Sequence, residues 1–204
     1  TNRINSELRL GGDIVSSNLW LVGGGKLSGS GSCSGTLNWS AGNLAYDGPI
    51  TITEDALLNV AGSGDHWLYR HLTNAGTIRL LGNGPVIFNN QFARVINLPG
   101  GLIDSPSDTR WNAWNSGGVV ENRGVIRNRD NSMTTFGSGV LLENYGTFET
   151  QSGISDLRSC LANNGSRFIG AGTNRVVGEF TLDGFISSSN LWLVAGGTIQ
   201  GSGG

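Results

Sequence analysis

The chain has 204 residues, of which 34 are glycine and 4 are proline, and only 14% are charged. With 37% hydrophobic residues and a formal net charge of −2, this composition excludes a self-repelling disordered chain and offers no basic surface for nucleic acid. Abundant glycine with little charge instead predicts β-structure with many tight bends.

The first element in the chain, residues 1–32, reads TNRINSELRLGGDIVSSNLWLVGGGKLSGSGS, with short apolar strands between glycine turns. The last element, residues 173–204, reads TNRVVGEFTLDGFISSSNLWLVAGGTIQGSGG. Without a gap, 19 of the 32 aligned positions are identical, at a constant offset of 173 − 1 = 172. We therefore expect residues 1–172 to form one complete solenoid repeat unit and residues 173–204 to begin the next unit on the same solenoid. Trp20 and Trp192 occupy equivalent apolar surroundings, and both are expected to be core or coil-packing residues.

A shorter repeat, an Asn-x-Gly turn followed by alternating apolar residues, runs through the middle of the chain. The turns are Asn74-Ala75-Gly76, Asn122-Arg123-Gly124, Asn144-Tyr145-Gly146 and Asn163-Asn164-Gly165, with a degenerate copy at Gly100-Gly101. Between the last glycines of successive turns, the steps are 101 − 76 = 25, 124 − 101 = 23, 146 − 124 = 22 and 165 − 146 = 19. A recurrence of this size is typical of one coil of a solenoid.

Stacked coils give these short strands a core. Each strand can bury only one face, so it needs the coil above it to cover that face and to pair its backbone. Asn and Gly suit the corners because both tolerate left-handed backbone conformations, and inward-facing Asn side chains at equivalent corners can form hydrogen-bonded ladders. The predicted fold is all-β: a right-handed parallel β-helix (β-solenoid) of roughly 8–10 coils of about 20–25 residues.

This winding places the two cysteines far apart. Cys33 and Cys160 are separated by 160 − 33 = 127 residues, or about six coils. Their Cα atoms then lie beyond the roughly 7 Å that a disulfide can bridge, so both are predicted to be unpaired within the monomer. No apolar run approaches the roughly 18 residues of a membrane span, so none is expected.

Two polar clusters follow in chain order: Asp104, Asp108 and Arg110 in DSPSDTR, and Arg127, Arg129 and Asp130 in RNRDN. β-Helical polysaccharide lyases and hydrolases use clustered carboxylates with Arg or Lys, so such an enzyme is one interpretation. Turns also favour Asp, Asn and Ser, and a unit repeated at high identity does not suit chemistry that needs a single site. We therefore expect polar corners, no catalytic residues and no enzymatic activity.

Metal and cofactor sites are not indicated. His66 and His71 stand 71 − 66 = 5 positions apart, a spacing that matches no common metal site. The recurrent Gly-Gly-x-Gly-x-Asp pattern of calcium-binding β-rolls is absent from the sequence. We expect neither a bound metal nor a cofactor.

Four aromatic residues gather where the coils are longest: Trp67, Tyr69, Trp111 and Trp114. Such rings stack on sugar rings, and the amides of Asn112 and Asn115 can bond hydroxyl groups, so these six residues form a candidate glycan-binding surface. The alternative interpretation is that the aromatic side chains pack beneath a long loop.

The Asn-x-Gly coils, with Gly-Gly-x-Leu-x-Gly-Ser-Gly runs such as residues 24–31, resemble the β-helical passenger and repeat regions of large bacterial surface proteins. Filamentous-haemagglutinin-like adhesins and autotransporters are the familiar examples. The resemblance covers the whole chain and implies a secreted or cell-surface protein of filamentous shape. It implies neighbouring repeat units of the same chain as partners, together with host or matrix glycans or proteins.

These features predict a non-enzymatic structural or adhesive repeat module of a long extracellular β-solenoid protein. One alternative is a carbohydrate-binding β-helix segment, which glycan binding that is lost in Trp111→Ala or Trp114→Ala would favour. The other is a β-helix polysaccharide lyase or hydrolase, whose turnover should be lost in Asp104→Ala or Asp108→Ala.

Overall fold

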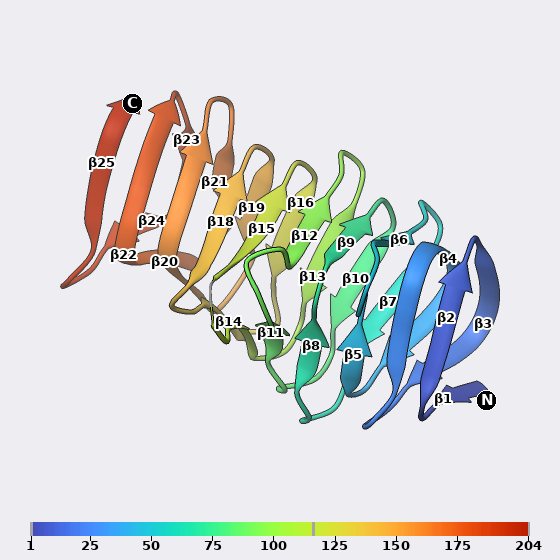
Figure 1. Ribbon diagram of the computed structural model, residues 1–204. Coiled ribbons are helices and arrows are strands. Elements are labelled where there is room, and N and C mark those ends of the chain that lie inside the picture. Colours follow the sequence, from blue (N-terminus) through green and yellow to red (C-terminus); the bar gives the residue numbers. More distant parts are fainter. Residues whose placement is uncertain (1, 116, 204) are drawn as a thin grey trace.

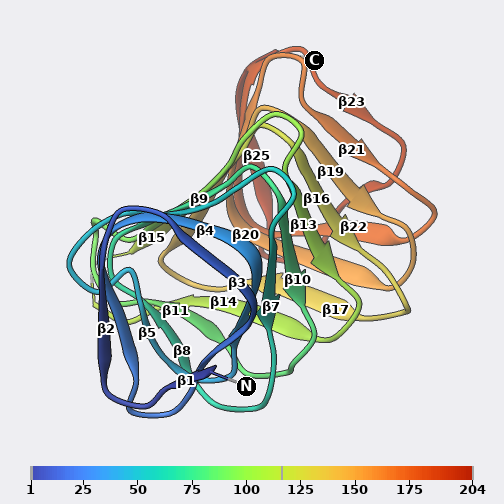
Figure 2. The same cartoon turned by 90° about the vertical axis from the view of Figure 1, so that its right-hand side faces the viewer.

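The structure is a computed structural model that describes residues 2–115 and 117–203. These residues form 25 β-strands and no helix, and strands of neighbouring coils pair in parallel. The chain makes about ten stacked turns, from β1 at the N-terminal end to β25 at the C-terminal end (Figure 1). Seen from the N-terminal end in Figure 2, the chain turns clockwise as it recedes, so the solenoid is right-handed. The predicted fold class is confirmed.

Three parallel sheets enclose the core, and each coil passes through sheets 1, 2 and 3 in turn. Sheet 1 contains β1 (Asn2–Ile4), β7 (Leu57–Val60), β10 (Thr77–Leu80), β13 (Leu102–Ser105), β16 (Val125–Asn128), β19 (Thr147–Thr150), β21 (Arg167–Ile169) and β23 (Ser187–Ser188). Sheet 2 contains β2 (Glu7–Gly11), β5 (Gly42–Leu44), β8 (His66–Leu68), β11 (Val86–Phe88), β14 (Thr109–Ala113), β17 (Met133–Phe136) and β24 (Leu191–Leu193). Sheet 3 contains β6 (Ile50–Ile52), β9 (His71–Asn74), β12 (Arg94–Asn97), β15 (Gly118–Asn122), β18 (Val140–Asn144) and β25 (Thr198–Gly203). Four longer strands bend from one sheet into the next: β3 (Ile14–Leu21), β4 (Lys26–Trp39), β20 (Ile154–Asn163) and β22 (Thr173–Gly184).

The register of the sheets gives the coil length directly. Five inward-facing residues of sheet 1 pair in succession: Ile78, Ile103, Ile126, Phe148 and Phe168. The steps between them are 103 − 78 = 25, 126 − 103 = 23, 148 − 126 = 22 and 168 − 148 = 20. These coil lengths agree with the spacing of the Asn-x-Gly turns.

The end coils are tighter than the middle ones. Ile4 pairs with Leu21, and Val176 pairs with Leu193, so the steps along the chain are only 21 − 4 = 17 and 193 − 176 = 17. From the sequence we expected coils of about 20–25 residues throughout. The shorter end coils have tighter glycine turns in place of longer loops.

A column of aromatic rings fills much of the core. Trp111 stacks on Phe136 with ring centroids 5.8 Å apart and an interplanar angle of 4°. The column continues on both sides through Phe88, Phe148, Phe168 and Phe180, and neighbouring rings are 5.3 to 6.1 Å apart. All six side chains are at most 1% exposed. Large rings at successive levels therefore pack together within a core whose other members are chiefly Leu, Ile and Val.

A second column, made of buried amides, runs along the corner between sheets 3 and 1. The Nδ2 of Asn74 donates to Oδ1 of Asn97 at 2.7 Å, Asn97 donates to Asn122 at 2.8 Å, and Asn122 donates to Asn144 at 2.7 Å. These four side chains are fully buried. Asn163 lies at the next corner but donates to the backbone oxygen of Asn144, at 3.4 Å, so it stands outside the amide-to-amide column.

The glycines of these turns are needed chiefly for space. A Cβ at Gly76, Gly124 or Gly146 would lie 2.3 to 2.4 Å from a carbonyl oxygen of the preceding coil, and none of the three has a positive φ. Gly165 is the exception, with a φ of 83° and open space where a Cβ would stand. The expectation of left-handed corners thus holds at Gly165, whereas close approach between coils explains the other three.

The two ends of the chain repeat one pattern of pairing. Ile4 pairs with Leu21 and Leu8 with Leu27 in the first copy. At the offset of 176 − 4 = 172, the equivalent pairs are Val176 with Leu193 and Phe180 with Ile199. The two copies do not lie on the same sheets, because the first copy starts on sheet 1 and the second on sheet 2.

Three expectations about single residues can be compared with this fold. Cys33 and Cys160 are both buried and form no disulfide in the described part of the chain, which confirms the prediction that they are unpaired. Of the two places expected for Trp20 and Trp192, the core is wrong: Trp20 is half-buried and Trp192 is 63% exposed, because the neighbouring leucines take the inward positions. No helix among the described residues is long and apolar enough to cross a membrane.

Candidate functional site

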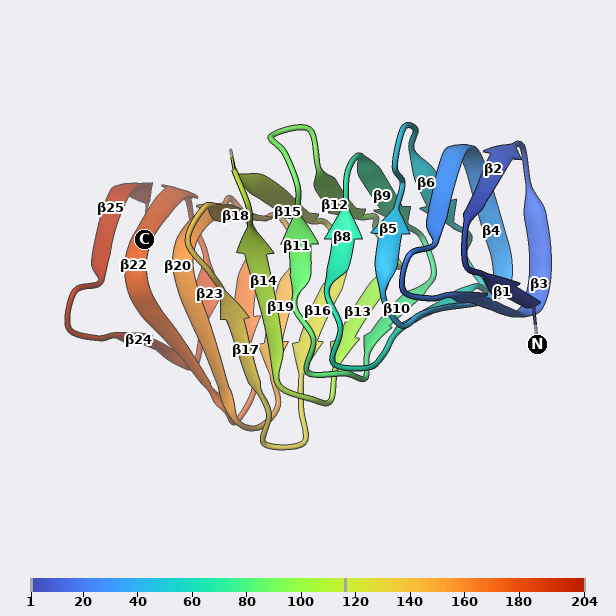
Figure 3. The ribbon, with the colours of Figure 1, turned by 60° about the horizontal axis from the view of Figure 1, so that its bottom comes forward.

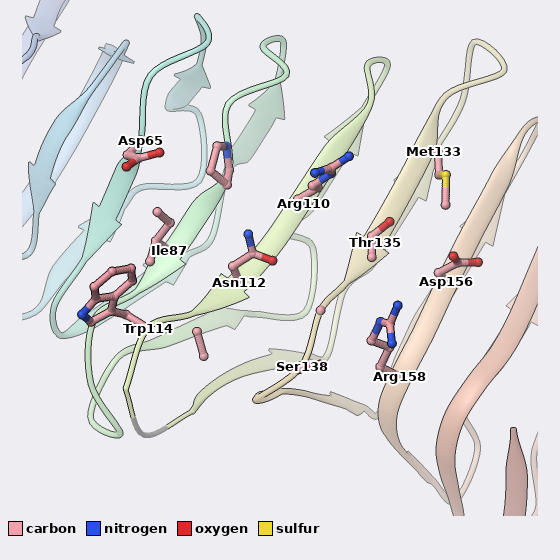
Figure 4. Close-up of a pocket in the computed structure, with 13 residues that line it drawn as sticks. Asp65, Ile87, Arg110, Asn112, Trp114, Met133, Thr135, Ser138, Asp156 and Arg158 are labelled. Atoms are coloured by element: carbon pink, nitrogen blue, oxygen red, sulfur yellow. The ribbon is translucent and has the colours of Figure 1, made fainter. Parts of the chain in front are cut away.

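The outer face of sheet 2 carries a shallow groove of about 810 Å³. Figure 3 shows the strands of this sheet side by side, and Figure 4 shows the side chains that line the groove. Alternate residues of a strand point to opposite faces, so the register places outward side chains in rows across the strands. Arg110, Thr135 and Asp156 pair in one row, and Ile87 pairs with Asn112 in the next.

One end of the groove is aromatic. Trp114 is 66% exposed and makes an edge-to-face contact with Trp67, with ring centroids 5.6 Å apart and an interplanar angle of 75°. Ile87 lies close by on β11, on the same outer face, and is only 7% exposed. An exposed indole supported by a second indole offers a firm apolar surface to a ligand.

The half of the groove that runs from β14 to β20 is positively charged. Arg110 and Arg158 are exposed, and neither forms an ion pair with any described residue. Asp156 lies on β20, two residues before Arg158, but it is 7% exposed and accepts two hydrogen bonds from Arg175, at 2.7 and 2.9 Å. This hydrogen bonding raises the pKa of the Arg175 guanidinium and occupies both oxygens of Asp156. The charges left free at this end are therefore those of the two arginines.

Half of the predicted glycan surface comes together in this groove. Asn112 on β14 and Trp114 just after this strand line the groove (Figure 4), and Trp67 on β8 supports Trp114 from beneath the aromatic end.

The other three predicted residues lie elsewhere. Trp111 is 1% exposed in the aromatic column, so its assignment to a ligand surface is wrong; it alternates with the outward Arg110 and Asn112 and must point inward. Tyr69 packs against Tyr46, with ring centroids 4.8 Å apart, outside the residues that line the groove. Asn115 is exposed after the end of β14 and does not line the groove.

Sequence reasoning missed Arg158 and Ile87. Arg158 belongs to β20, which has no Asn-x-Gly turn before it to reveal its register. Ile87 stands in the apolar run Val86–Phe88, in which no polar neighbour shows which side chain faces outward. Of the two arginines in the groove, the sequence pointed only to Arg110, and then as part of a possible catalytic cluster.

No family model, curated protein or solved structure matches the chain. The β-solenoid fold is thus established by the stacking of its own strands. The resemblance to bacterial adhesins and autotransporter passengers remains a prediction from the sequence.

The carboxylates considered for catalysis are tied into other contacts. Asp104 is 4% exposed and accepts hydrogen bonds from Nε and Nη2 of Arg129, at 2.9 and 3.0 Å. This hydrogen bonding raises the pKa of Arg129. Asp108 accepts a hydrogen bond from the backbone N–H of Met133, at 2.8 Å, and Arg127 pairs with Glu149 at 2.7 Å.

The two polar clusters are also divided between sheets. Asp104 faces outward from sheet 1, whereas Arg110 faces outward from sheet 2. Asp104 pairs in register with Arg127, as the spacing of about one coil suggested. The structure therefore pairs Asp104 with Arg129 and Arg127 with Glu149 on the sheet 1 side, and leaves Arg110 in the groove on sheet 2.

The two histidines are not brought together. His66 is fully buried, and its ring nitrogens lie 3.2 Å from Pro85 O and 3.1 Å from Ala61 O. Burial lowers the pKa of His66. His71 is exposed. Within residues 2–115 and 117–203, no group of three or more His, Cys, Asp or Glu side chains is placed to hold a metal ion.

Proposed function

We propose that this chain is a structural and adhesive repeat module of a longer extracellular β-solenoid, with no catalytic role. The observation that carries the proposal is the pair of matching ends: one sequence pattern, in one register, occurs at both ends of a single solenoid. A unit that recurs in this way suits a rod, because each unit continues the stack of the one before it.

The burial of the matching side chains supports a continuing stack. Leu21 and Leu27 are fully buried, whereas their equivalents, Leu193 and Ile199, are 56% and 45% exposed. The difference comes from the next coil: Trp39 pairs with Leu21, and Leu44 pairs with Leu27. A following coil of the same kind would cover the exposed pair and bury its apolar surface.

The surface of the solenoid also suits a stiff rod. Charged side chains of opposite sign alternate between coils, as in the pair of Arg94 with Glu121 at 2.7 Å and the pair of Arg127 with Glu149 at 2.7 Å. Such pairs link successive coils on the outside, while the amide and aromatic columns link them inside. An extracellular location rests on the resemblance to large bacterial surface proteins, and the adhesive role would belong to outward-facing side chains.

A two-unit protein tests the proposal. In it, residues 33–204 are repeated after residue 204, so that the offset of 172 is kept. We expect one continuous rod that is longer than the single unit by about 40 Å, which is about eight coils at 4.8 Å each, in small-angle X-ray scattering. Two globules joined by a flexible segment, or an unchanged maximum dimension, would contradict the proposal.

The substitution Leu193→Asp tests whether the second unit stacks directly on the last coil of the first. In the single unit this side chain is 56% exposed, so the substitution should change the stability by less than about 0.5 kcal/mol. In the two-unit protein the same position should be buried, and the cost should rise to about 3 kcal/mol or more. Equal costs in the two proteins would show that no coil stacks on this end.

The non-enzymatic part of the proposal has its own test. We expect no turnover of polyuronates or other glycans by the purified chain. Turnover that is lost in Asp104→Ala or Asp108→Ala would establish an enzyme instead.

A further inference from the structure

We propose that the groove on sheet 2 binds an anionic oligosaccharide, with carboxylated or sulfated sugars, that lies along the solenoid axis and across the strands. This binding site goes beyond the role of the chain as a rod. It is complete within one unit, so it does not depend on whether units stack in tandem.

The shape of the groove suits an extended ligand. It crosses from β8 to β20, a distance of four strand spacings, or about 19 Å. Gly137 keeps the lining open beside Asn112, because a Cβ there would lie 2.7 Å from Oδ1 of Asn112 and 3.0 Å from the carbonyl oxygen of Trp111. A compact ligand would leave most of this length empty, whereas a linear chain of several sugars covers it.

The aromatic end provides a stacking surface. Trp114 keeps 66% of its surface exposed although Trp67 supports it edge-on, so a face of the indole is open to a ligand. Sugar rings present flat apolar C–H faces that pack on indole, and a fixed ring loses little conformational freedom on binding.

The charged end selects for anions. Arg110 and Arg158 are exposed and free of ion pairs within the described chain, and a guanidinium group binds carboxylate or sulfate through two parallel hydrogen bonds. Asp156, the acidic side chain next to Arg158 on β20, accepts a hydrogen bond from Arg175 on each of its two oxygens. Asp65, the other acidic residue of the groove, lies on the β8 side, across the sheet from Arg158 (Figure 4).

These charges orient the ligand. Its anionic groups should lie over β14 to β20, near the arginines, and an uncharged sugar face should lie over Trp114. Between the two ends, the Asn112 amide and the Thr135 hydroxyl point into the groove and can bond sugar hydroxyls (Figure 4).

The experiment is a titration of the purified chain with three tetrasaccharides: a polyuronate, a sulfated oligosaccharide, and the polyuronate with its carboxyl groups reduced to alcohols. We expect saturable binding of at least one acidic ligand, weakened by salt, and about ten-fold weaker binding of the reduced one. The preference between the two acidic ligands identifies the anionic group.

Variants locate the binding. Arg110→Gln, Arg158→Gln and Trp114→Ala should each weaken the acidic ligand about ten-fold or more, because each removes a charge-assisted hydrogen bond or a stacking surface. Arg167→Gln is the matched control: this arginine is also exposed but lies on sheet 1, and its loss should leave the affinity unchanged.

Three results would overturn the binding site. They are no saturable binding of either acidic ligand, equal affinity for the reduced ligand, and an affinity that the groove variants change no more than Arg167→Gln does. None of these results would alter the length or the stability of the two-unit protein. The proposal of a rod and the proposal of a binding groove are therefore tested independently.

Discussion

Asn122 occupies the middle of the amide column and bonds in both directions along the axis. Its Nδ2 donates to Oδ1 of Asn144 at 2.7 Å and to the backbone oxygen of Thr147 at 3.0 Å, and its own Oδ1 accepts from Asn97 at 2.8 Å. The column ends on atoms without a described partner, Oδ1 of Asn74 and Nδ2 of Asn144. The interior amides are therefore the ones whose loss leaves the most buried polar atoms unpaired.

Removal of that amide should be costly. We expect Asn122→Ala to lower the free energy of unfolding by about 2–4 kcal/mol, because two buried acceptors lose their donor and a small cavity remains. Asn115→Ala, at an exposed position, should change it by less than about 0.5 kcal/mol. Chemical denaturation of both variants measures the difference, and similar midpoints would show that the column adds little stability.

The thiols should be unreactive in the folded chain. Burial raises the pKa of Cys33 to about 11 and raises that of Cys160 as well, so both remain protonated thiols at pH 8. We expect neither to react with a maleimide at pH 8 until denaturant is added, whereas a cysteine introduced by Asn115→Cys should react at once. Rapid labelling of the native wild-type chain would contradict the burial of both residues.

The same shifts set a direction for alkaline stability. In the unfolded chain a thiol ionises near pH 8.5, whereas in the folded chain Cys33 holds its proton until about pH 11. The unfolded state therefore binds fewer protons above pH 8.5, and stability is lost as the pH rises through this window. We expect Cys33→Ala to reduce that loss between pH 8.5 and 11, as measured by the unfolding midpoint against pH.

The alternation of inward and outward side chains along a strand explains which predictions of burial were right and which were wrong. Arg110 and Asn112 are polar, so they mark the outward positions of β14 and place Trp111 in the core and Trp114 outside. Applied to this strand, the period of two would have excluded Trp111 from the glycan surface. In Leu19-Trp20-Leu21 all three residues are apolar, and only pairing with the coil above decides that the leucines point inward.

Strand corners show how two kinds of glycine differ. A Cβ at Gly124 would lie 2.3 Å from the backbone oxygen of Gly101, whereas at Gly165 nothing lies within 4 Å although the φ is 83°. We expect Gly124→Ala to cost about 3 kcal/mol by forcing two coils apart, and Gly165→Ala to cost about 1 kcal/mol of backbone strain. Denaturant midpoints of the two variants test this order, and a larger loss at Gly165 would reverse the assignment.

The coils themselves could be predicted because one corner repeats. The Asn-x-Gly turns marked the corner between sheets 3 and 1 at nearly every middle level, so their spacing gave the coil length. The groove could be predicted only in part, because it lies on sheet 2, where no comparable motif marks the register. Arg158 reaches the groove through pairing with neighbouring coils, which one sequence does not reveal.

The proposed repeat unit, residues 1–172, does not contain a whole number of turns. From Asn2, sheet 1 is reached again at Leu19, Leu37 and so on, and Phe168 completes the eighth turn. Asn174, the equivalent of Asn2, then lies on sheet 2, because it pairs with Ser155 and Leu191. One unit therefore spans eight turns plus one further sheet, or about a third of a turn.

The additional third of a turn in each unit predicts how successive units are oriented. In the two-unit protein, the second copy of the groove should lie on sheet 3, about 40 Å along the axis and rotated by about a third of a turn from the first. A longer array would then present its grooves in a spiral that returns to the same side every third unit. A structure of the two-unit protein measures the rotation directly, and grooves aligned on one side would show that the coil lengths change at the junction. A spiral would let a rod with one groove per unit meet anionic glycans from every direction around its axis.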